Sequence, residues 1–456
     1  MITRQLCHTL DVSDPLAPLR ELFDLPEGIV YLDGNSLGAL PRSTAARVAQ
    51  VVQDQWGTGL IGSWNHAGWM DLPQRVGDKI ARLVGAGPGE LIAVDSTSVN
   101  LYKALHSAVR LARLQHLERD PQAGARRLVI VSEASNFPTD LYIAQSVARE
   151  TGATVLALDA DAIRPWLAAH ALPRPGVPGR DLPPRATLDY DLAAVLLLTQ
   201  VNYRSGRQHD MGALTAAAHA AGALTVWDLA HSAGAVPVDL KGADADLAVG
   251  CGYKYLNGGP GAPAFIWAHP RITATLHAQG LSQPLTGWIG HAAPFEFGPD
   301  YRPAAGIAGF QCGTPPVLAL AALDCGVDTV LAAEEQGGMA ALRAKSVELA
   351  ELFISLLESR CAGAGLTVIS PRDPGERGSQ VSIACELDEG CAYPITQALI
   401  ARGVVGDFRS PDVLRFGFTP LYTRFVDVYD AVEQLRQVLV SGEWREPRFA
   451  VRAQVT

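Results

Sequence analysis

The segment "ADLAVGCGYKYLNGGPG" (residues 245–261) combines a small, apolar run, a lysine between two tyrosines, and a glycine-rich loop. The apolar run predicts a buried strand that ends just before Lys254. A partly desolvated lysine amine next to a carbonyl can form a Schiff base, so Lys254 is a candidate chemical group. The alternative is a lysine whose stem packs on tyrosine while its ammonium reaches water. On the first interpretation, the small residues leave room for a ligand to approach.

Similar units, each an apolar strand followed by a polar turn, precede this segment, and most of them continue into a helix. The strands are expected in "ELIAVD" (90–95), "RRLVIVSE" (126–133), "ATVLALD" (153–159), "LAAVLLLT" (192–199) and "ALTVWD" (223–228). Continuous apolar strands that alternate with helices predict an α/β fold with a mostly parallel central sheet covered by helices on both faces. Ligands bind past the carboxyl ends of such strands, so the polar turns are where we expect chemistry.

The rest of the chain predicts three parts. Residues 1–42 are expected to form an N-terminal arm that packs with a small domain. Residues 43–313 are expected to form the large domain, which begins with a helix near Ser43. Residues 314–456 read as a smaller α+β domain, and the proline-rich segment 164–190 reads as a surface insertion.

Composition limits the classes of function. The net charge is −10 without basic runs, which argues against nucleic acid or an anionic membrane as a main partner. The seven cysteines are scattered without a C-x-x-C pair, so we expect reduced thiols, no metal site and a cytoplasmic protein. The N-terminus lacks a signal-peptide pattern, and no apolar window reaches the length of a membrane span.

Two polar turns could bind a flat, anionic ligand. Thr97 and Ser98 open a helix, where hydroxyls and free N–H groups favour a phosphate; the alternative is a simple helix cap. After the next strand, Phe137 could stack on a ring and Asp140 could face a ring nitrogen. The alternative there is a turn with a capping residue and a core phenylalanine.

A third turn carries Asp228 at the end of an apolar strand, followed by His231. A carboxylate at that position is costly unless it is paired, so it either neutralises a protonated heterocycle or caps the turn. Taken in order, a phosphate turn, a stacking aromatic, an aspartate and Lys254 are the parts that pyridoxal 5'-phosphate requires. The sequence therefore predicts this cofactor, with Lys254 as the residue that bonds its aldehyde.

The chain resembles the kynureninase family, which consists of fold-type I pyridoxal-phosphate enzymes. The resemblance covers nearly the whole chain and rests on "YLDGNSLGALP" (31–41), "FPTD" (137–140), "DLAHSAG" (228–234), "YKYLNGGPG" (253–261), "GWIGH" (287–291), "GTPPV" (313–317) and "LRFGFTPLY" (414–422). One departure is Thr314, where some members carry asparagine. Segment 164–190 also looks longer than the family needs.

The resemblance implies a role for each matching residue. Lys254, Tyr253 and Asp228 would be catalytic, and Arg415 would hold the substrate α-carboxylate as a bidentate fork. Ser36 and Trp64 would border the substrate's aromatic ring. The cofactor would be bound by Thr97, Ser98, Phe137, Asp140, Thr199, Asp228, His231, Tyr253, Lys254, Trp288 and Thr314. Trp288 and Thr314 would come from the neighbouring subunit of a homodimer with shared active sites.

The implied reaction is hydrolysis of the Cβ–Cγ bond of L-kynurenine to anthranilate and L-alanine, in tryptophan catabolism. The sequence does not decide between kynurenine and 3-hydroxykynurenine. Two alternatives stay open. One is a lyase of the same fold, such as a cysteine desulfurase, which needs a nucleophilic cysteine on a mobile loop. The other is a non-catalytic protein on the same fold, against which the pairing of Lys254 with Asp228 argues.

Overall fold

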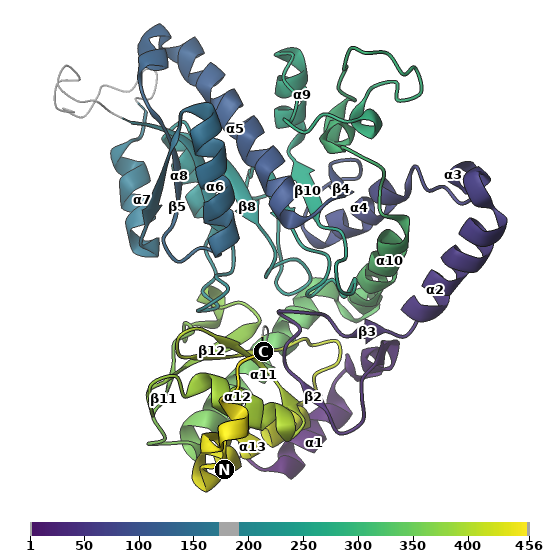
Figure 1. Cartoon of the computed structure of the whole chain (residues 1–456). Helices are drawn as coiled ribbons and strands as arrows, with labels where there is room; N and C mark the ends of the chain where they lie inside the picture. Colours follow the sequence, from purple (N-terminus) through teal and green to yellow (C-terminus); the bar gives the residue numbers. More distant parts are fainter. Residues whose placement is uncertain (1, 173–190, 454–456) are drawn as a thin grey trace.

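A computed structural model of the chain describes residues 2–172 and 191–453. Its larger part is built on a seven-stranded sheet with the order β4-β10-β9-β8-β7-β5-β6 (Figure 1). The strands are β4 (Leu91–Ala93), β5 (Leu128–Glu133), β6 (Thr154–Leu158), β7 (Leu192–Thr199), β8 (Leu224–Asp228), β9 (Leu247–Gly250) and β10 (Phe265–Ala268). Strands β5 to β9 are parallel, whereas β10 is antiparallel to β4 and β9. The predicted mostly parallel sheet is thus confirmed.

Helices cover both faces of this sheet. One face carries α5 (Thr97–Arg119), α6 (Pro138–Thr151) and α9 (Pro270–Ala278); the other carries α4 (Leu72–Leu83), α7 (Ala160–Ala169) and α8 (Met211–Ala220). Strand β7 shows why its sequence is apolar throughout. Leu196 and Leu198 enter one core, while Val195 and Leu197 enter the other, as expected for a strand buried on both sides.

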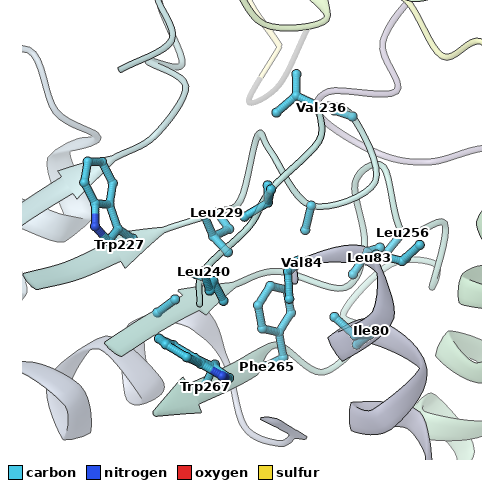
Figure 2. Close-up of a cluster of buried hydrophobic side chains, with 14 of the residues drawn as sticks. Ile80, Leu83, Val84, Trp227, Leu229, Val236, Leu240, Leu256, Phe265 and Trp267 are labelled. Atoms are coloured by element: carbon cyan, nitrogen blue, oxygen red, sulfur yellow. The ribbon is translucent and has the colours of Figure 1, made fainter. Parts of the chain in front are cut away.

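The core below the sheet's carboxyl edge supports the chain segments that carry the predicted site. Figure 2 shows Phe265 and Trp267 packed with side chains of α4 and of the loops around β8 and β9. Burying Phe265 fully contributes roughly 1.5–3 kcal/mol. Leu229 and Leu256 belong to the same cluster, so the residues next to Asp228 and Lys254 are fixed by core packing.

The smaller part contains a four-stranded antiparallel sheet with the order β11-β12-β15-β14. The strands are β11 (Leu366–Val368), β12 (Gln380–Cys385), β14 (Asp407–Arg409) and β15 (Val413–Gly417), and the helices are α11 (Gly338–Arg360), α12 (Ala392–Ala401) and α13 (Phe425–Ser441). The expected α+β character is confirmed.

The N-terminal segment packs on this smaller part. Helix α1 (Arg4–Ser13) lies beside α13, where the Asp11 carboxylate accepts hydrogen bonds from the first N–H groups of that helix (Figure 1). Strand β2 (Val30–Tyr31) pairs in parallel with β13 (Val404–Val405), and β1 (Phe23–Asp24) pairs with β3 (Leu40–Pro41).

The connection between the two parts does not follow a sharp border. Helix α10 (Val317–Leu331) contributes Leu320, Leu323 and Val327 to the large core, whereas the separate core of the smaller part begins at Leu349 in α11. The division into 1–42, 43–313 and 314–456 therefore stays a proposal. The predicted helix near Ser43 is α2 (Thr44–Gln50), which continues through a π-helical segment and then leads to α3 (Ser63–His66), away from the body of the molecule (Figure 1).

One expectation about the cysteines is wrong. Cys385, at the end of β12, and Cys391, just before α12, form a disulfide, although we expected reduced thiols throughout. A loop of only a few residues brings the two sulfurs together, and no C-x-x-C spacing signals this. Of the predicted insertion 164–190, residues 164–169 end α7, and residues 173–190 lie outside the described residues. None of the helices in the described residues is long and apolar enough to cross a membrane.

Candidate active site

A cavity of ≈ 240 Å³ lies at the carboxyl edge of the large sheet. Its walls come from the start of α5, the turn before α6, and the residues that follow β7, β8 and β9. Nine of the predicted site residues line it, namely Thr97, Ser98, Phe137, Asp140, Thr199, Asp228, His231, Tyr253 and Lys254. The rule that ligands bind past parallel strand ends thus located a real cavity.

Lys254 faces His231 inside this cavity. The distance from the Lys254 Nζ to the His231 Nε2 is 3.0 Å. Burial lowers the pKa of His231 well below its usual value, and the positive charges of Lys254, Arg415 and Arg409 lower it further. His231 is therefore neutral and can accept a hydrogen bond from the amine. Its Nδ1 is buried, and hydrogen bonding with the Gln380 side chain acts in the opposite direction on the pKa of His231.

Two buried carboxylates, Asp140 and Asp228, also line the cavity. Burial raises the pKa of Asp140 well above its usual value, and the negative charge of Asp228 raises it further. Burial also raises the pKa of Asp228, although the positive charge of Lys254 opposes this. Thr199 donates a hydrogen bond to Asp140 at 3.2 Å, and Asp228 accepts one from the backbone N–H of Ala230 at 2.8 Å. Such a pair favours a cationic neighbour or retains a proton.

The start of α5 provides an anion-binding end. Ser96 caps the helix by accepting a hydrogen bond from the Val99 N–H, so Thr97 and Ser98 occupy its first turn. First-turn N–H groups lack intrahelical acceptors, and the helix dipole favours negative charge there. The helix cap is thus Ser96, and the next two residues line the cavity; phosphate binding by this turn stays a prediction. Burial also raises the pKa of Tyr253, which keeps its phenol protonated at neutral pH.

An aromatic wall flanks the cavity. Phe137 is 41% exposed, and its ring contacts Tyr203 edge to face, with a centroid distance of 5.2 Å. An exposed phenylalanine at a cavity wall is available to stack on a flat ring. Tyr203 was not predicted, although it follows the carboxyl end of β7, where the sheet rule already pointed.

The glycines of the Lys254 loop have a different task from the one expected. A Cβ on Gly252 would collide with the carbonyl oxygen of Pro263, and a Cβ on Gly258 would collide with that of Gly252. The chain itself fills the space beside these two glycines, so they allow tight packing of the loop. The expectation that small residues make room for the ligand is therefore wrong for these two positions.

Arg415 lies in a separate cluster next to the cavity. Its Nε donates to Asp407 at 2.8 Å, and its terminal nitrogens donate to Asp407 again, to the Ser36 hydroxyl at 2.9 Å and to the Tyr203 carbonyl at 2.7 Å. Arg409 contacts the same Asp407 carboxylate at 2.8 Å. The side chain of Ser36 therefore contacts residues of this arginine cluster.

Besides Arg415 and Ser36, three further predicted residues do not line the cavity. Trp288 is 38% exposed and packs edge to face on Phe295, and Thr314 is exposed in the irregular segment that precedes α10. Trp64 lies in α3 and contacts Trp69. Their predicted roles remain predictions.

Other residues of the site carried weaker signals in the sequence. Thr139 and Ala230 line the cavity and lie within the segments already singled out. Asp407 and Arg409 had no motif of their own, because their position depends on how the small sheet meets the N-terminal segment.

Among the described residues, no group of three or more His, Cys, Asp or Glu side chains could hold a metal ion.

Comparison with known proteins finds a matching family model and full-length relatives. Residues 342–435 match the family model of the kynureninase C-terminal domain. The chain is 52% identical over 456 residues to a kynureninase of Burkholderia pseudomallei (strain 1106a), and 48% identical over 458 residues to a kynureninase of Pseudomonas fluorescens. Both alignments cover 100% of each chain.

Solved structures with a similar fold are more distant in sequence. A cysteine desulfurase from Thermococcus onnurineus NA1 superimposes with a TM-score of 0.71 at 16% identity, over 93% of this chain and 98% of the other. The cystine C–S lyase C-DES gives 0.69 at 15% identity, over 90% and 98%. These two show the shared fold only, whereas the full-length likeness to the curated relatives is decisive: the chain belongs to the kynureninase family.

Proposed function

We propose that this chain is a pyridoxal-phosphate-dependent hydrolase that cleaves L-kynurenine into anthranilate and L-alanine. The name of its full-length relatives supports this activity. The observation that carries the proposal is the cavity in which Lys254 faces His231 and which Asp140 and Asp228 also line. Whether 3-hydroxykynurenine is also a substrate is decided by assay, because the described residues contain no marker for the extra hydroxyl.

The residues of the cavity fit pyridoxal phosphate. The first turn of α5 suits its phosphate, and the exposed face of Phe137 suits its ring. Asp140 and Asp228 are buried together, and a protonated ring nitrogen would supply a cation that compensates them. Lys254 would hold the aldehyde. When bound, the cofactor withdraws electrons from the substrate carbon that bears the amine.

Each side chain then has a defined task. Asp228 keeps the ring nitrogen protonated by opposing its charge. With its amine free of the cofactor, Lys254 would take a proton from the Cα of the substrate, and neutral His231 would hold that amine in place by accepting its hydrogen bond. In the hydrolysis a water molecule would add to the Cγ ketone, so that Cγ becomes the carboxyl carbon of anthranilate when the Cβ–Cγ bond breaks, and the protonated Tyr253 phenol could supply the proton that Cβ gains.

The same proposal includes a homodimer with shared sites. Trp288 and Thr314 are exposed, and several large apolar side chains near them and along the α2–α3 segment are exposed as well, among them Trp56, Leu60, Ile61, Phe295 and Phe297. Exposed apolar surface of this kind fits a protein interface. In a shared site, Trp288, Thr314 and Trp64 would reach the cavity of the neighbouring subunit.

A mixture of two variants tests sharing. Chains with Lys254→Ala and chains with Thr314→Ala are co-expressed with different tags, and the mixed dimer is purified. If Thr314 serves the neighbour's site, one site of the mixed dimer carries both substitutions and the other carries neither. Activity above that of either parent dimer is expected, and activity no higher than the Thr314→Ala parent would contradict sharing.

Turnover is tested directly. The purified protein with pyridoxal phosphate is given L-kynurenine, and anthranilate is followed by its fluorescence; 3-hydroxykynurenine and L-cysteine are tested in parallel. No observation favours sulfur release from L-cysteine, because Cys385 and Cys391 form a disulfide and Cys361 is buried. Sulfide or persulfide formation without anthranilate would overturn the proposal.

A further inference from the structure

Most of the hydrogen-bond donors of Arg415 are already occupied and are not free to bind a substrate. Its side chain is 1% exposed, and four of the five N–H groups of its guanidinium are occupied by Asp407, Ser36 and the Tyr203 carbonyl. A free bidentate fork for a carboxylate requires two parallel N–H groups. Arg415 as it stands therefore cannot supply the whole binding site for the substrate carboxylate.

Arg409 is the more open member of the same cluster. Its side chain is 32% exposed, and it shares the Asp407 carboxylate at 2.8 Å and the Ser36 hydroxyl at 3.3 Å with Arg415. One terminal nitrogen also donates to the Phe408 carbonyl at 3.0 Å. Its Nε has no hydrogen-bond acceptor within residues 2–172 and 191–453. Arg409 thus retains donor capacity on a partly accessible guanidinium.

The charges of the cluster leave a positive surplus. Burial alone would raise the pKa of Asp407, but Arg415 and Arg409 hold it below its usual range, so this carboxylate is ionised. Two guanidinium charges then face one ionised carboxylate. The nearby Asp33 is half-buried and offsets the surplus only when it loses its proton.

The cluster borders the cavity. Tyr203 lines the cavity with its side chain and accepts from Arg415 with its carbonyl, and both arginines contribute to the lowered pKa of His231. A substrate whose amine lies at Lys254 would therefore have its carboxylate on the side of this cluster.

We propose that Arg409 binds the substrate carboxylate together with Arg415, and that Asp407 is the positioning residue that holds the two guanidiniums side by side. The proposal rests on the proposed function, because it needs an amino-acid substrate at Lys254. Arg415 is the buried anchor, Arg409 offers the accessible donors, and the surplus charge attracts the anion. A lone surface arginine would offer none of this preorganisation.

The test compares two ligands that differ only by the carboxylate. L-homophenylalanine has the skeleton of kynurenine without the scissile ketone, and 3-phenylpropylamine is the same molecule without the carboxylate. Their dissociation constants are measured from changes in the visible spectrum of the cofactor-loaded protein. The ratio of the two constants reports carboxylate recognition alone, and it does not depend on turnover.

Arg409→Gln is expected to reduce this ratio about tenfold, since a charge-assisted hydrogen bond is lost. Arg204→Gln is the matched control, because Arg204 is next to Tyr203 but pairs with Asp412 at 2.9 Å, outside the cluster. The control ratio should stay within about twofold of the parent. If Arg409→Gln weakens both ligands equally, or neither, Arg409 has only a structural role and the proposal is overturned.

A second variant, Arg409→Lys, serves as the test if Arg409→Gln folds poorly. Arg409→Lys retains the charge but not the fork, so about a threefold reduction of the ratio is expected. An unchanged ratio in Arg409→Lys would also overturn the proposal when Arg409→Gln cannot be purified. If the parent protein shows carboxylate preference but no hydrolysis of L-kynurenine, the proposed function fails while the role of Arg409 is still measured.

Discussion

The cavity around Lys254 and the arginine cluster beside it are assembled in opposite ways. Apart from the start of α5, the cavity residues follow strands β5, β7, β8 and β9 of one parallel sheet, so a single sheet places them together. The cluster joins Asp33 and Ser36 of the N-terminal segment, the Tyr203 carbonyl of the large sheet's edge, and Asp407 to Arg415 of the small sheet.

Their charges are also opposite. The cavity contains two buried carboxylates whose pKa values are raised, so it favours a cation, whereas the cluster contains two arginines around one ionised aspartate. The cavity suits an electron-withdrawing cationic ring, and the cluster suits the carboxylate of an amino acid. The cavity can form once the large sheet folds, but the cluster exists only when three parts of the chain have met. We therefore expect the rate of the chemical reaction to depend on the cavity and the affinity for the substrate to depend on the arginine cluster.

The largest effect is expected from Lys254→Ala. Removing the amine abolishes covalent attachment of the cofactor and the proton transfer at Cα, so kcat should fall at least about 10³-fold. The visible absorption band of the bound cofactor should change in the same variant. A borohydride-reduced adduct found on another lysine of the parent protein would contradict the assignment.

A change in the cluster should be smaller and should act on affinity. A lysine in place of Arg415 cannot reach Asp407, Ser36 and the Tyr203 carbonyl together, because it is a point charge without the planar fork. Arg415→Lys is expected to lower kcat/KM at least about a hundredfold, roughly 2.7 kcal/mol, and to leave the cofactor spectrum intact. Steady-state kinetics with Arg204→Lys as control check this; near-normal kinetics would leave carboxylate binding to Arg409.

Asp228→Asn separates chemistry from cofactor binding within the cavity. The amide no longer opposes the charge of the ring nitrogen, so kcat should fall more than about tenfold, roughly 1.4 kcal/mol, while the cofactor dissociation constant changes less. Asp140→Asn is the matched comparison, because both carboxylates are buried and influence each other. If Asp140→Asn is the more damaging change, Asp140 is the partner of the ring.

The same contrast explains what the sequence could predict. Thr199, Asp228 and Lys254 were accessible to prediction because an apolar strand ends at or just before each of them, and parallel strands end at one edge. The helix expected to open at Thr97 and Ser98 is α5 for a similar reason, since Ser96 is a local capping signal.

The residues that escaped prediction depend on distant contacts. Asp407 has no local pattern that separates it from an ordinary strand residue, and its meaning comes from Ser36 and Arg415 across the fold. The bond between Cys385 and Cys391 depends on how a strand end meets a helix start. The resemblance to the kynureninase family pointed to Arg415 as the residue that binds the carboxylate. It did not show that Asp407 already accepts hydrogen bonds from the guanidinium of Arg415.

The smallest effect concerns Asp33 and the pH dependence of the cluster. Burial and the negative charge of Asp407 together raise the pKa of Asp33 to about 7, although the positive charge of Arg415 opposes them. The proton therefore stays on Asp33 below about pH 7 and leaves above it. An ionised Asp33 cancels the positive surplus that attracts the substrate carboxylate, so affinity should be constant below pH 7 and weaken above it.

Asp33→Asn is the test, because the amide imitates the protonated acid at every pH. Between pH 6.5 and 8.5 the KM of the parent protein should rise severalfold relative to that of Asp33→Asn, while the ratio of their kcat values stays level. Substrate amine titration affects both proteins equally and cancels in the ratio. Asp33 also faces the phenols of Tyr255 and Tyr422, whose raised pKa values keep them neutral throughout this range. A KM ratio independent of pH would mean that Asp33 does not sense the substrate carboxylate, and the cluster would then differ from the cavity in assembly but not in its response to protons.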